Sequence, residues 1–211
     1  CIRDRIVDYM KLKEEAPKYG AEPTMVSYEE FLEISSRSEG RLEYINGEII
    51  MQASPNSFHQ EAVGNLHVIF KTYLKGKGCK VYLAPFDVTL YKVKKDGERL
   101  NIPDVIQPDL LIACDTKEKI NDKGRYSGVP RLVVEVLSPS TKTRDILVKC
   151  NSFMLGGCGE YWVVDVEKKT VMQYVFQDRE VAECETFKLG DSVKSIAVEG
   201  LEVFVDDVFE E

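Results

Sequence analysis

The spacing of apolar residues predicts a chain that mixes β-strands with helices. Two alternating runs, 41–45 and 48–51, flank Asn46-Gly47, a dipeptide typical of two-residue hairpin turns. Between residues 57 and 74 the apolar positions recur every three or four residues, which predicts a helix. Further along the chain we predict strands at 81–93 (interrupted near Pro85), 109–114, 131–138, 161–166 and 171–176, a polar loop at 115–128 and a helix at 140–155.

This order of elements predicts an α/β fold. The strand–helix–strand segment at 131–166 implies a parallel, right-handed crossover. The earlier strands should add antiparallel members, which gives a mixed central β-sheet flanked by a helix on each face. Ser27 and Glu30 form a capping-box pattern that begins a short helix before the hairpin. We expect residues 1–24 to form an N-terminal helical arm and residues 25–211 to form a single domain.

Composition narrows the class of protein. Among the 211 residues no apolar run is long enough to span a bilayer, and the first residues do not resemble a signal peptide. Together these observations predict a cytoplasmic protein without a membrane partner. The six cysteines, none in a C-x-x-C arrangement, are interpreted as reduced thiols. A zinc site or a disulfide framework is the alternative.

Charge is distributed unevenly along the chain. The net charge of −8 argues mildly against a nucleic-acid partner. Residues 71–159, however, carry 16 basic and 10 acidic side chains, whereas residues 160–211 carry 5 basic and 14 acidic ones. The middle third could therefore form a local anion-binding face, or its lysines could merely solvate loops.

Glu135 interrupts a strand that is otherwise apolar from residue 132 to residue 137. A buried ionised carboxylate is costly unless a proton, a cation or a metal neutralises it. We predict that Glu135 is buried in a strand covered on both faces. In the alternative interpretation, its side chain points to a solvated face of the sheet.

Asp109 and Lys149 are the other two candidates for chemistry. Asp109 follows Pro108 and directly precedes an apolar strand, and we prefer it to the similar Asp104 for that reason. Lys149 shares one helix face with Ile146 and Phe153, a face that should meet the sheet. Lys149 could otherwise reach out to solvent from a helix rim or pair with Asp145, four residues earlier.

Two carboxylates on neighbouring strands and one lysine on the next helix suit metal-assisted chemistry on phosphates. Hard oxygen ligands favour Mg²⁺ or Mn²⁺, and Asp109 and Glu135 are the metal-ligand candidates. Such an ion holds a phosphodiester and lowers the pKa of bound water. Lys149 would orient that water or offset charge that develops in the transition state.

A family resemblance rests on six sets of residues within roughly 25–180. They are Leu42-Glu43-Tyr44-Ile45-Asn46-Gly47-Glu48, His59, Pro108-Asp109, residues 134–141, Asp145 with Lys149, and Glu160-Tyr161-Trp162-Val163-Val164-Asp165. With these, the chain resembles the Uma-two family of restriction-endonuclease-like proteins, assigned to the PD-(D/E)XK nuclease superfold. The resemblance implies that Asp109 takes the Asp role and Glu135 the (D/E) role. It also implies that the domain at 25–211 has a restriction-endonuclease-like core.

The chain departs from the superfold pattern at one position. The lysine expected two residues after Glu135 is Leu137. Superfold members can supply this lysine from the following helix, where Lys149 is the natural candidate.

Two histidines, two acids and two aromatic residues are further candidates for the site. Glu43 could be another acid at the metal, or it could pair with Arg41 or a lysine at the surface. His59 could contact phosphate or act as a base, or it could serve in helix capping or packing. Asp87 could be a third acid near the metal, whereas His67 and the aromatic pair Tyr161-Trp162 are interpreted as structural.

The leading hypothesis is a metal-dependent endonuclease that hydrolyses phosphodiester bonds of DNA. One alternative is a catalytically inactive nucleic-acid-binding or assembly module on the same fold, and another is a hydrolase of a different phosphoester. Many nucleases of this type cut both strands as symmetric dimers, so a homodimer is one oligomeric state to test. The sequence itself contains no signature of a dimer.

Overall fold

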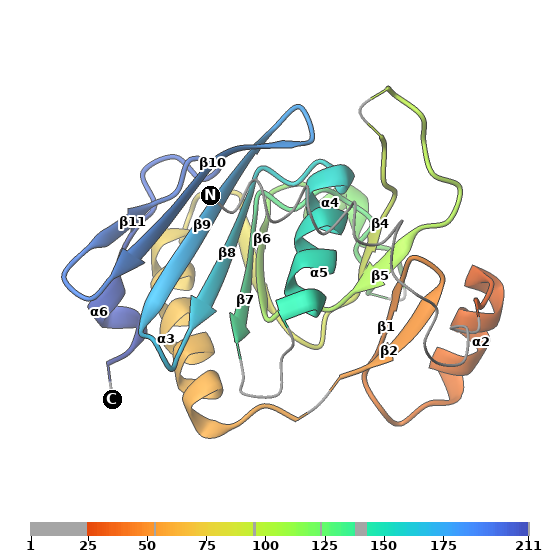
Figure 1. Ribbon diagram of the computed structural model, residues 1–211, viewed down its shortest axis with the longest axis horizontal. Coiled ribbons are helices and arrows are strands. Elements are labelled where there is room, and N and C mark those ends of the chain that lie inside the picture. Colours follow the sequence, from red (N-terminus) through yellow and green to blue (C-terminus); the bar gives the residue numbers. More distant parts are fainter. Residues whose placement is uncertain (1–24, 53, 95, 123, 138–142, 211) are drawn as a thin grey trace.

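The computed structural model describes residues 25–210 apart from 53, 95, 123 and 138–142. It contains a six-stranded sheet, a four-stranded sheet and a small C-terminal hairpin (Figure 1). The predicted N-terminal arm at 1–24 lies outside the described residues, and the single domain at 25–211 stays a prediction.

The six-stranded sheet forms the centre of the molecule. Its order is β10–β9–β8–β7–β6–β3, with β3 (Lys80–Leu83), β6 (Leu110–Ala113), β7 (Leu132–Leu137), β8 (Glu160–Asp165), β9 (Thr170–Gln177) and β10 (Glu180–Lys188). β7 and β8 are parallel, and every other neighbouring pair in this sheet is antiparallel. The predicted mixed sheet with a parallel crossover is therefore confirmed.

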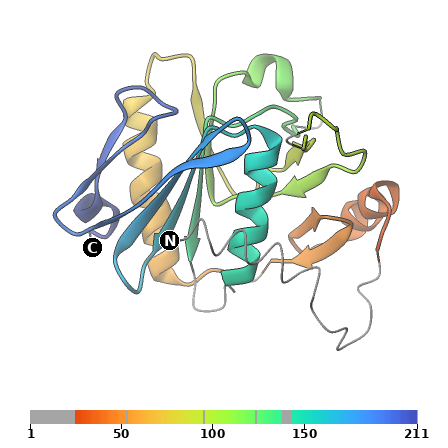
Figure 2. The ribbon, with the colours of Figure 1, turned by 45° about the horizontal axis from the view of Figure 1, so that its top comes forward.

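Two helices cover opposite faces of this sheet. α3 (Ser57–Tyr73) lies on one face and α5 (Thr143–Gly156) on the other, so that the strands pass between them (Figure 2). Because side chains alternate along a strand, Leu132 and Val134 pack in the cluster that contains α3, while Val133 packs in the cluster that contains α5. The same alternation turns Glu135 toward α5.

The four-stranded sheet packs against the far side of α5. Its order is β2–β1–β5–β4, with β1 (Leu42–Ile45), β2 (Glu48–Met51), β4 (Val88–Leu90) and β5 (Asp104–Ile106). Asn46 and Gly47 both have positive φ angles, 53° and 85°, as the predicted hairpin turn requires. Helix α2 (Tyr28–Arg37) begins with the predicted capping box between Ser27 and Glu30.

Strand β5 was not predicted, and it changes the interpretation of Asp104. A strand follows Asp104 as directly as one follows Asp109, so the reason for preferring Asp109 was insufficient. The Asp104 carboxylate is buried and lies 2.7 Å from Lys92 Nζ, and its Oδ1 accepts a 2.9 Å hydrogen bond from the backbone of Asn46. Asp104 therefore holds the hairpin turn against β4 and β5.

The C-terminal residues add a small hairpin and a one-turn helix. β11 (Ser192–Lys194) pairs antiparallel with β12 (Glu202–Phe204), and α6 (Val205–Val208) follows and contacts α3. The predicted polar loop at 115–128 contains a short helix, α4 (Thr116–Lys119), and a fully buried Tyr126. The hydroxyl of Tyr126 donates a 2.6 Å hydrogen bond to Asp115, which fixes this loop locally.

The prediction of six reduced thiols is wrong for two cysteines. Cys79 and Cys114 form a disulfide. They flank β3 and β6, whose antiparallel register pairs Lys80 with Ala113, so the pairing brings the two Cα atoms to 4.0 Å. Cys150 and Cys158 are buried free thiols, and Cys184 is exposed. No helix of the described residues is both long and apolar enough to cross a membrane.

Candidate active site

Asp109 stands at the point where β6 meets β7. Leu110 pairs with Val134, so the antiparallel register places Asp109 level with Glu135. The Oδ2 atom of Asp109 accepts a 2.8 Å hydrogen bond from the backbone N–H of Val136. His59 comes from the first turn of α3, and its Nε2 lies 3.1 Å from the same oxygen. The N-cap of α3 is Asn56, which leaves the His59 ring free to face the carboxylate.

Lys149 joins two buried carboxylates from different sheets. Its Nζ lies 2.9 Å from Oε1 of Glu43 in β1 and 3.1 Å from Oε1 of Glu135 in β7. All three side chains are buried. Helix α5 therefore places one ammonium group between the two sheets. Glu135 does not face solvent, and Lys149 is not a lysine at the helix rim, so both of those alternatives are wrong. Glu43 pairs with a lysine inside the protein rather than at its surface.

Burial sets the protonation of this trio. Burial raises the pKa of Glu135 to about 8; Lys149 opposes the shift, while the like charges of Asp109 and Glu43 add to it. Burial also raises the pKa of Glu43, against the stabilising effect of Lys149 and the Gln107 N–H. Burial alone would lower the pKa of Lys149, but Glu135 and Glu43 overcome it and hold that pKa above its usual value.

A layer of polar side chains supports Glu43. The backbone N–H of Gln107 donates a 2.9 Å hydrogen bond to Oε1 of Glu43, and the side-chain amide of Gln52 donates to Oε2. The Gln107 side chain donates at 2.7 Å to Asp87, whose other oxygen lies 3.3 Å from Arg125 Nε. Asp87 is thus held by a glutamine and an arginine, so its proposed role as a third acid near the metal loses support.

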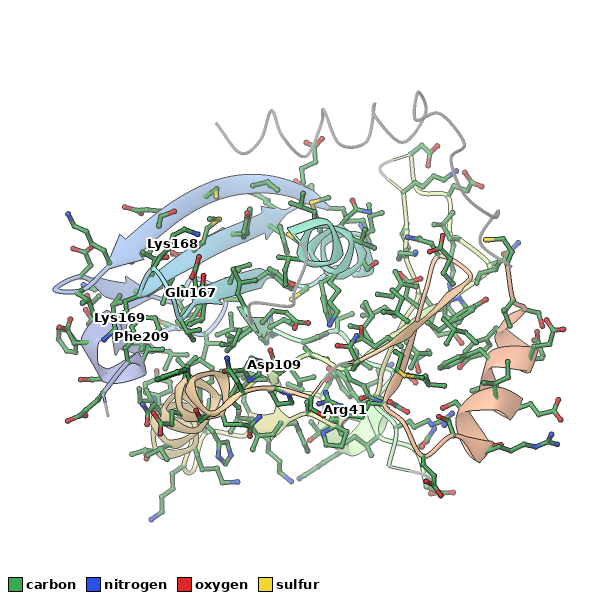
Figure 3. All side chains as sticks on the ribbon, turned by 60° about the horizontal axis from the view of Figure 1, so that its bottom comes forward. Arg41, Asp109, Glu167, Lys168, Lys169 and Phe209 are labelled. Atoms are coloured by element: carbon green, nitrogen blue, oxygen red, sulfur yellow. A yellow bond between two sulfur atoms is a disulfide. The ribbon has the colours of Figure 1, made fainter. Side chains whose placement is uncertain are left out.

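Figure 3 shows the edge of the molecule on which Asp109 and Arg41 both lie. Arg41, just before β1, donates from Nε to Oε1 of Gln107 at 3.2 Å.

The sequence interpretation missed Arg41, Gln52 and Gln107 as parts of the site. Gln107 could have been found because it stands two residues before Asp109 in Gln-Pro-Asp. The side chain of Asp145, the other predicted partner of Lys149, lies outside the described residues.

The donor set of the site suits the expected divalent cation. Asp109 and Glu135 offer hard carboxylate oxygens at level positions on neighbouring strands, and Mg²⁺ commonly binds through one or two carboxylates with several waters. Lys149 contacts Glu43 and Glu135, whereas Asp109 contacts only the Val136 N–H and His59 among the described residues, so a cation at Asp109 would find a carboxylate without a lysine or arginine partner. Among the described residues, no three or more His, Cys, Asp or Glu side chains already form a metal-binding group. Asp109 and Glu135 thus fit a water-rich ion and stay predicted ligands.

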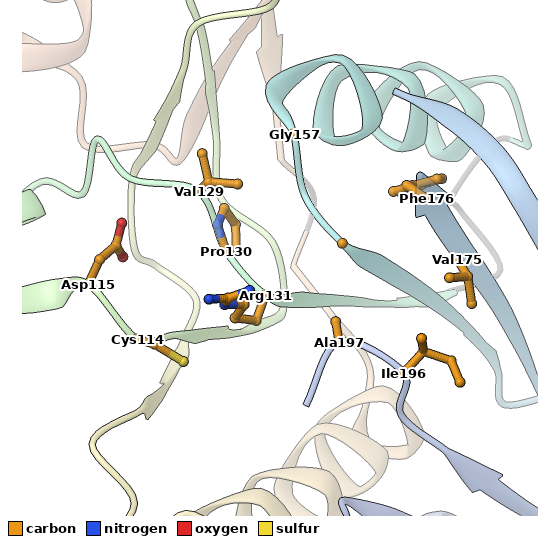
Figure 4. Close-up of a pocket in the computed structure, with 11 residues that line it drawn as sticks. Cys114, Asp115, Val129, Pro130, Arg131, Gly157, Val175, Phe176, Ile196 and Ala197 are labelled. Carbon is orange, nitrogen blue, oxygen red and sulfur yellow. The ribbon is translucent and has the colours of Figure 1, made fainter. Parts of the chain in front are cut away.

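A cavity of about 490 Å³ lies at the opposite end of β7 (Figure 4). It is lined mainly by apolar side chains, and its charged residues are Asp115 and Arg131. None of the residues predicted for chemistry lines it. The cavity and the carboxylate cluster are therefore separate features of the molecule.

Comparisons with known proteins agree with this fold. The model of the Uma2 (Uma-two) family, described as "Putative restriction endonuclease", matches residues 28–206. An uncharacterized protein of Synechocystis sp. is 27% identical over 120 residues, a stretch that spans 57% of this chain and 57% of that relative.

A crystal structure of a protein from Anabaena variabilis, described as a putative nuclease belonging to DUF820, is also similar. It superposes with a TM-score of 0.70 at 19% identity and covers 87% of this chain and 97% of that one. At this identity the likeness concerns the fold alone. The family match covers most of the chain, including Glu43, Asp109, Glu135 and Lys149. The chain therefore belongs to the Uma2 family.

Proposed function

We propose that the protein is a metal-dependent endonuclease that hydrolyses phosphodiester bonds of DNA. The observation that carries this proposal is the position of Lys149. Its ammonium lies 3.1 Å from Glu135 although the sequence has no lysine two residues after that glutamate. Helix α5 thus brings to Glu135 the cation that the superfold pattern supplies from the strand.

Asp109 and Glu135 would hold the ion, and Lys149 would act beside it. A bound Mg²⁺ or Mn²⁺ supplies charge that holds a phosphodiester and lowers the pKa of water. Lys149 would offset negative charge that develops on the phosphate during attack. Glu43 keeps the ammonium of Lys149 charged and in place, because it shares that cation with Glu135.

His59 would transfer a proton or contact a phosphate beside Asp109. Its Nε2 faces Asp109, and its Nδ1 is buried without a hydrogen-bond partner among the described residues. An imidazole that is oriented by a carboxylate suits transfer of a proton from water or to a leaving oxygen. His59 would thus assist the reaction from the α3 side.

A binding module without turnover is the second candidate. One observation favours it: Lys149 already contacts both Glu43 and Glu135, so the buried carboxylates have a cation without any metal. Such a protein would bind nucleic acid but would not need to bind Mn²⁺. The proposed homodimer has no bearing on this choice and stays a prediction.

The deciding experiment is calorimetric titration of Mn²⁺ into the wild-type protein and Asp109→Ala, followed by incubation of the loaded proteins with plasmid DNA. We expect saturable binding and nicking by the wild type, and loss of both in Asp109→Ala. Asp122→Asn, which removes an exposed carboxylate from the loop after α4, is the matched control and should behave as the wild type. Binding without nicking would favour another phosphoester, and no Mn²⁺ binding would favour the binding module.

A further inference from the structure

We propose that Arg41 binds a phosphate group of the nucleic-acid strand directly beside the carboxylate cluster. This inference rests on the proposed function, because it assigns how the same site holds its substrate. In this role Arg41 positions the nucleic-acid strand and takes no part in proton transfer or metal binding.

The first support is the contact that Arg41 makes. Its Nε donates to the side-chain oxygen of Gln107, a neutral amide, at 3.2 Å. Among the described residues, no carboxylate lies within ion-pair distance of Arg41. Arg41 lowers the pKa of Glu43 at longer range, but its guanidinium has no direct ionic partner within the described part of the chain and can still accept an anion.

The second support is that the neighbouring cations are already paired. Lys149 is buried between Glu43 and Glu135, and Arg125 lies 3.3 Å from Asp87. Arg41 is only partly buried and lies on the same edge as Asp109 (Figure 3). An anionic strand that approaches the carboxylates must be stabilised by positive charge, and Arg41 is well placed to provide it.

The third support is the way in which Gln107 fixes Arg41. Gln107 also donates its backbone N–H to Glu43 and its side-chain N–H to Asp87, so both ends of this residue are held. Holding Nε orients the planar guanidinium and leaves its two Nη groups to donate elsewhere. Two parallel N–H groups match two phosphate oxygens, which is the geometry that favours arginine over lysine for phosphate.

The test is direct binding of a fluorescein-labelled 20-base-pair DNA duplex, measured by fluorescence anisotropy in EDTA so that no cleavage occurs. Dissociation constants are measured from 50 to 200 mM NaCl. Arg41→Gln should bind about tenfold more weakly at 50 mM, which is what loss of one charge-assisted contact implies. Its slope of log K against log salt should be smaller by about 1 than that of the wild type.

Two further variants sharpen this test. Lys117→Gln removes one positive charge from exposed α4, beyond the end of β6 that is far from Asp109, and should bind within twofold of the wild type. Arg41→Lys keeps the charge but loses the fork, so it should keep the salt slope and bind a few-fold more weakly. It also serves as the test if Arg41→Gln fails to fold, which thermal unfolding would reveal.

The outcomes separate this inference from the proposed function. Weaker binding by Arg41→Gln supports the inference even if the wild type cuts no DNA, in which case only the nuclease assignment fails. Three results would overturn the inference. Both Arg41 variants could bind DNA as tightly as the wild type, Lys117→Gln could lose as much affinity as Arg41→Gln, or the wild type could fail to bind DNA. If the wild type nicks plasmid DNA and Arg41→Gln binds the duplex as tightly as the wild type, the nuclease assignment stands and only this inference fails.

Discussion

At the scale of single residues, Lys149 determines whether the interior of the site is stable. One ammonium faces two carboxylates that are both removed from water. Taking away one partner of a buried ion pair leaves an uncompensated charge, whereas the intact pair adds little net stability. Lys149 should therefore matter for folding as well as for chemistry.

Lys149→Met should lower the free energy of unfolding by about 3 kcal/mol at pH 8, because Glu43 and Glu135 lose their shared cation. Urea unfolding measures this change. Lys117→Met on exposed α4 is the control and should alter stability by less than about 0.5 kcal/mol. A methionine side chain fills similar space to a lysine, so equal stability of Lys149→Met and the wild type would contradict the proposed pairing. The variant should still bind Mn²⁺, since the predicted ligands remain.

Glu135 should make Mn²⁺ binding depend on pH. Burial raises its pKa from 4.5 to about 8, so a proton competes with a metal ion for this carboxyl below that pH. A metal ligand must lose its proton, and affinity should therefore rise about tenfold per pH unit from pH 6 and level off above pH 8. Calorimetry across this range measures it, and a flat affinity would refute the assignment of Glu135 as a ligand.

The same pKa shift has a defined effect on stability without metal. Between pH 4.5 and about 8 the folded state binds a proton that the unfolded chain has released. Stability from this group is therefore fully present below pH 4.5 and is lost as the pH rises through about 8.

The sequence was sufficient to predict the residues that stand out against their surroundings. Glu135 in an apolar strand and Lys149 on an apolar helix face are such positions, and both are buried as predicted. Gln107 and Arg41 have no such contrast, because a glutamine and an arginine near a turn are ordinary at a surface. Their connection to Glu43 depends on β1 and β5 being neighbours, a long-range pairing with no local signal.

At the scale of elements, Glu160 holds the C-terminal hairpin to the central sheet. This buried carboxylate at the start of β8 accepts hydrogen bonds from Trp162 Nε1, Gln173 Nε2, Ser195 Oγ and the backbone N–H groups of residues 196 and 197. The last three donors belong to the segment between β11 and β12. One carboxylate thus joins β8 and β9 to a segment more than thirty residues farther along the chain.

Glu160→Gln should lower stability by about 2–4 kcal/mol, because an amide cannot accept all of these bonds and loses their charge-assisted strength. Hydrogen exchange at residues 192–204 should become faster, which distinguishes release of the hairpin from global unfolding. Glu183→Gln, at an exposed position of β10 outside the measured segment, is the matched control. Unchanged exchange at 192–204 would show that apolar packing alone holds the hairpin.

The elements that the sequence predicted are those with strong local patterns. The Asn46-Gly47 hairpin, α3 and the β7–α5–β8 crossover all have periodic apolar positions or turn residues. β5 and α4 are only three and four residues long, too short for a period to be recognised. Tertiary pairing, with β1 and β4 for β5, determines such short segments.

At the scale of the whole molecule, the site lies where two sheets meet across one helix. Glu43 comes from the small sheet, Asp109 and Glu135 from the large sheet, and Lys149 from α5 between them. The relative placement of the two sheets therefore determines the geometry of the site. Asp109 follows β5 by only three residues, so the same segment of chain links the small sheet to the large one.

The Cys79–Cys114 disulfide closes a covalent ring around this linking segment. Asp87, Gln107 and Asp109 all lie on the ring, whereas Glu43 and His59 precede it and Glu135 and Lys149 follow it. A single break in the peptide backbone anywhere inside the ring would leave the two fragments joined through sulfur. A nicked chain would thus keep all of its site residues in one covalent molecule, with Asp109 still tethered to both halves.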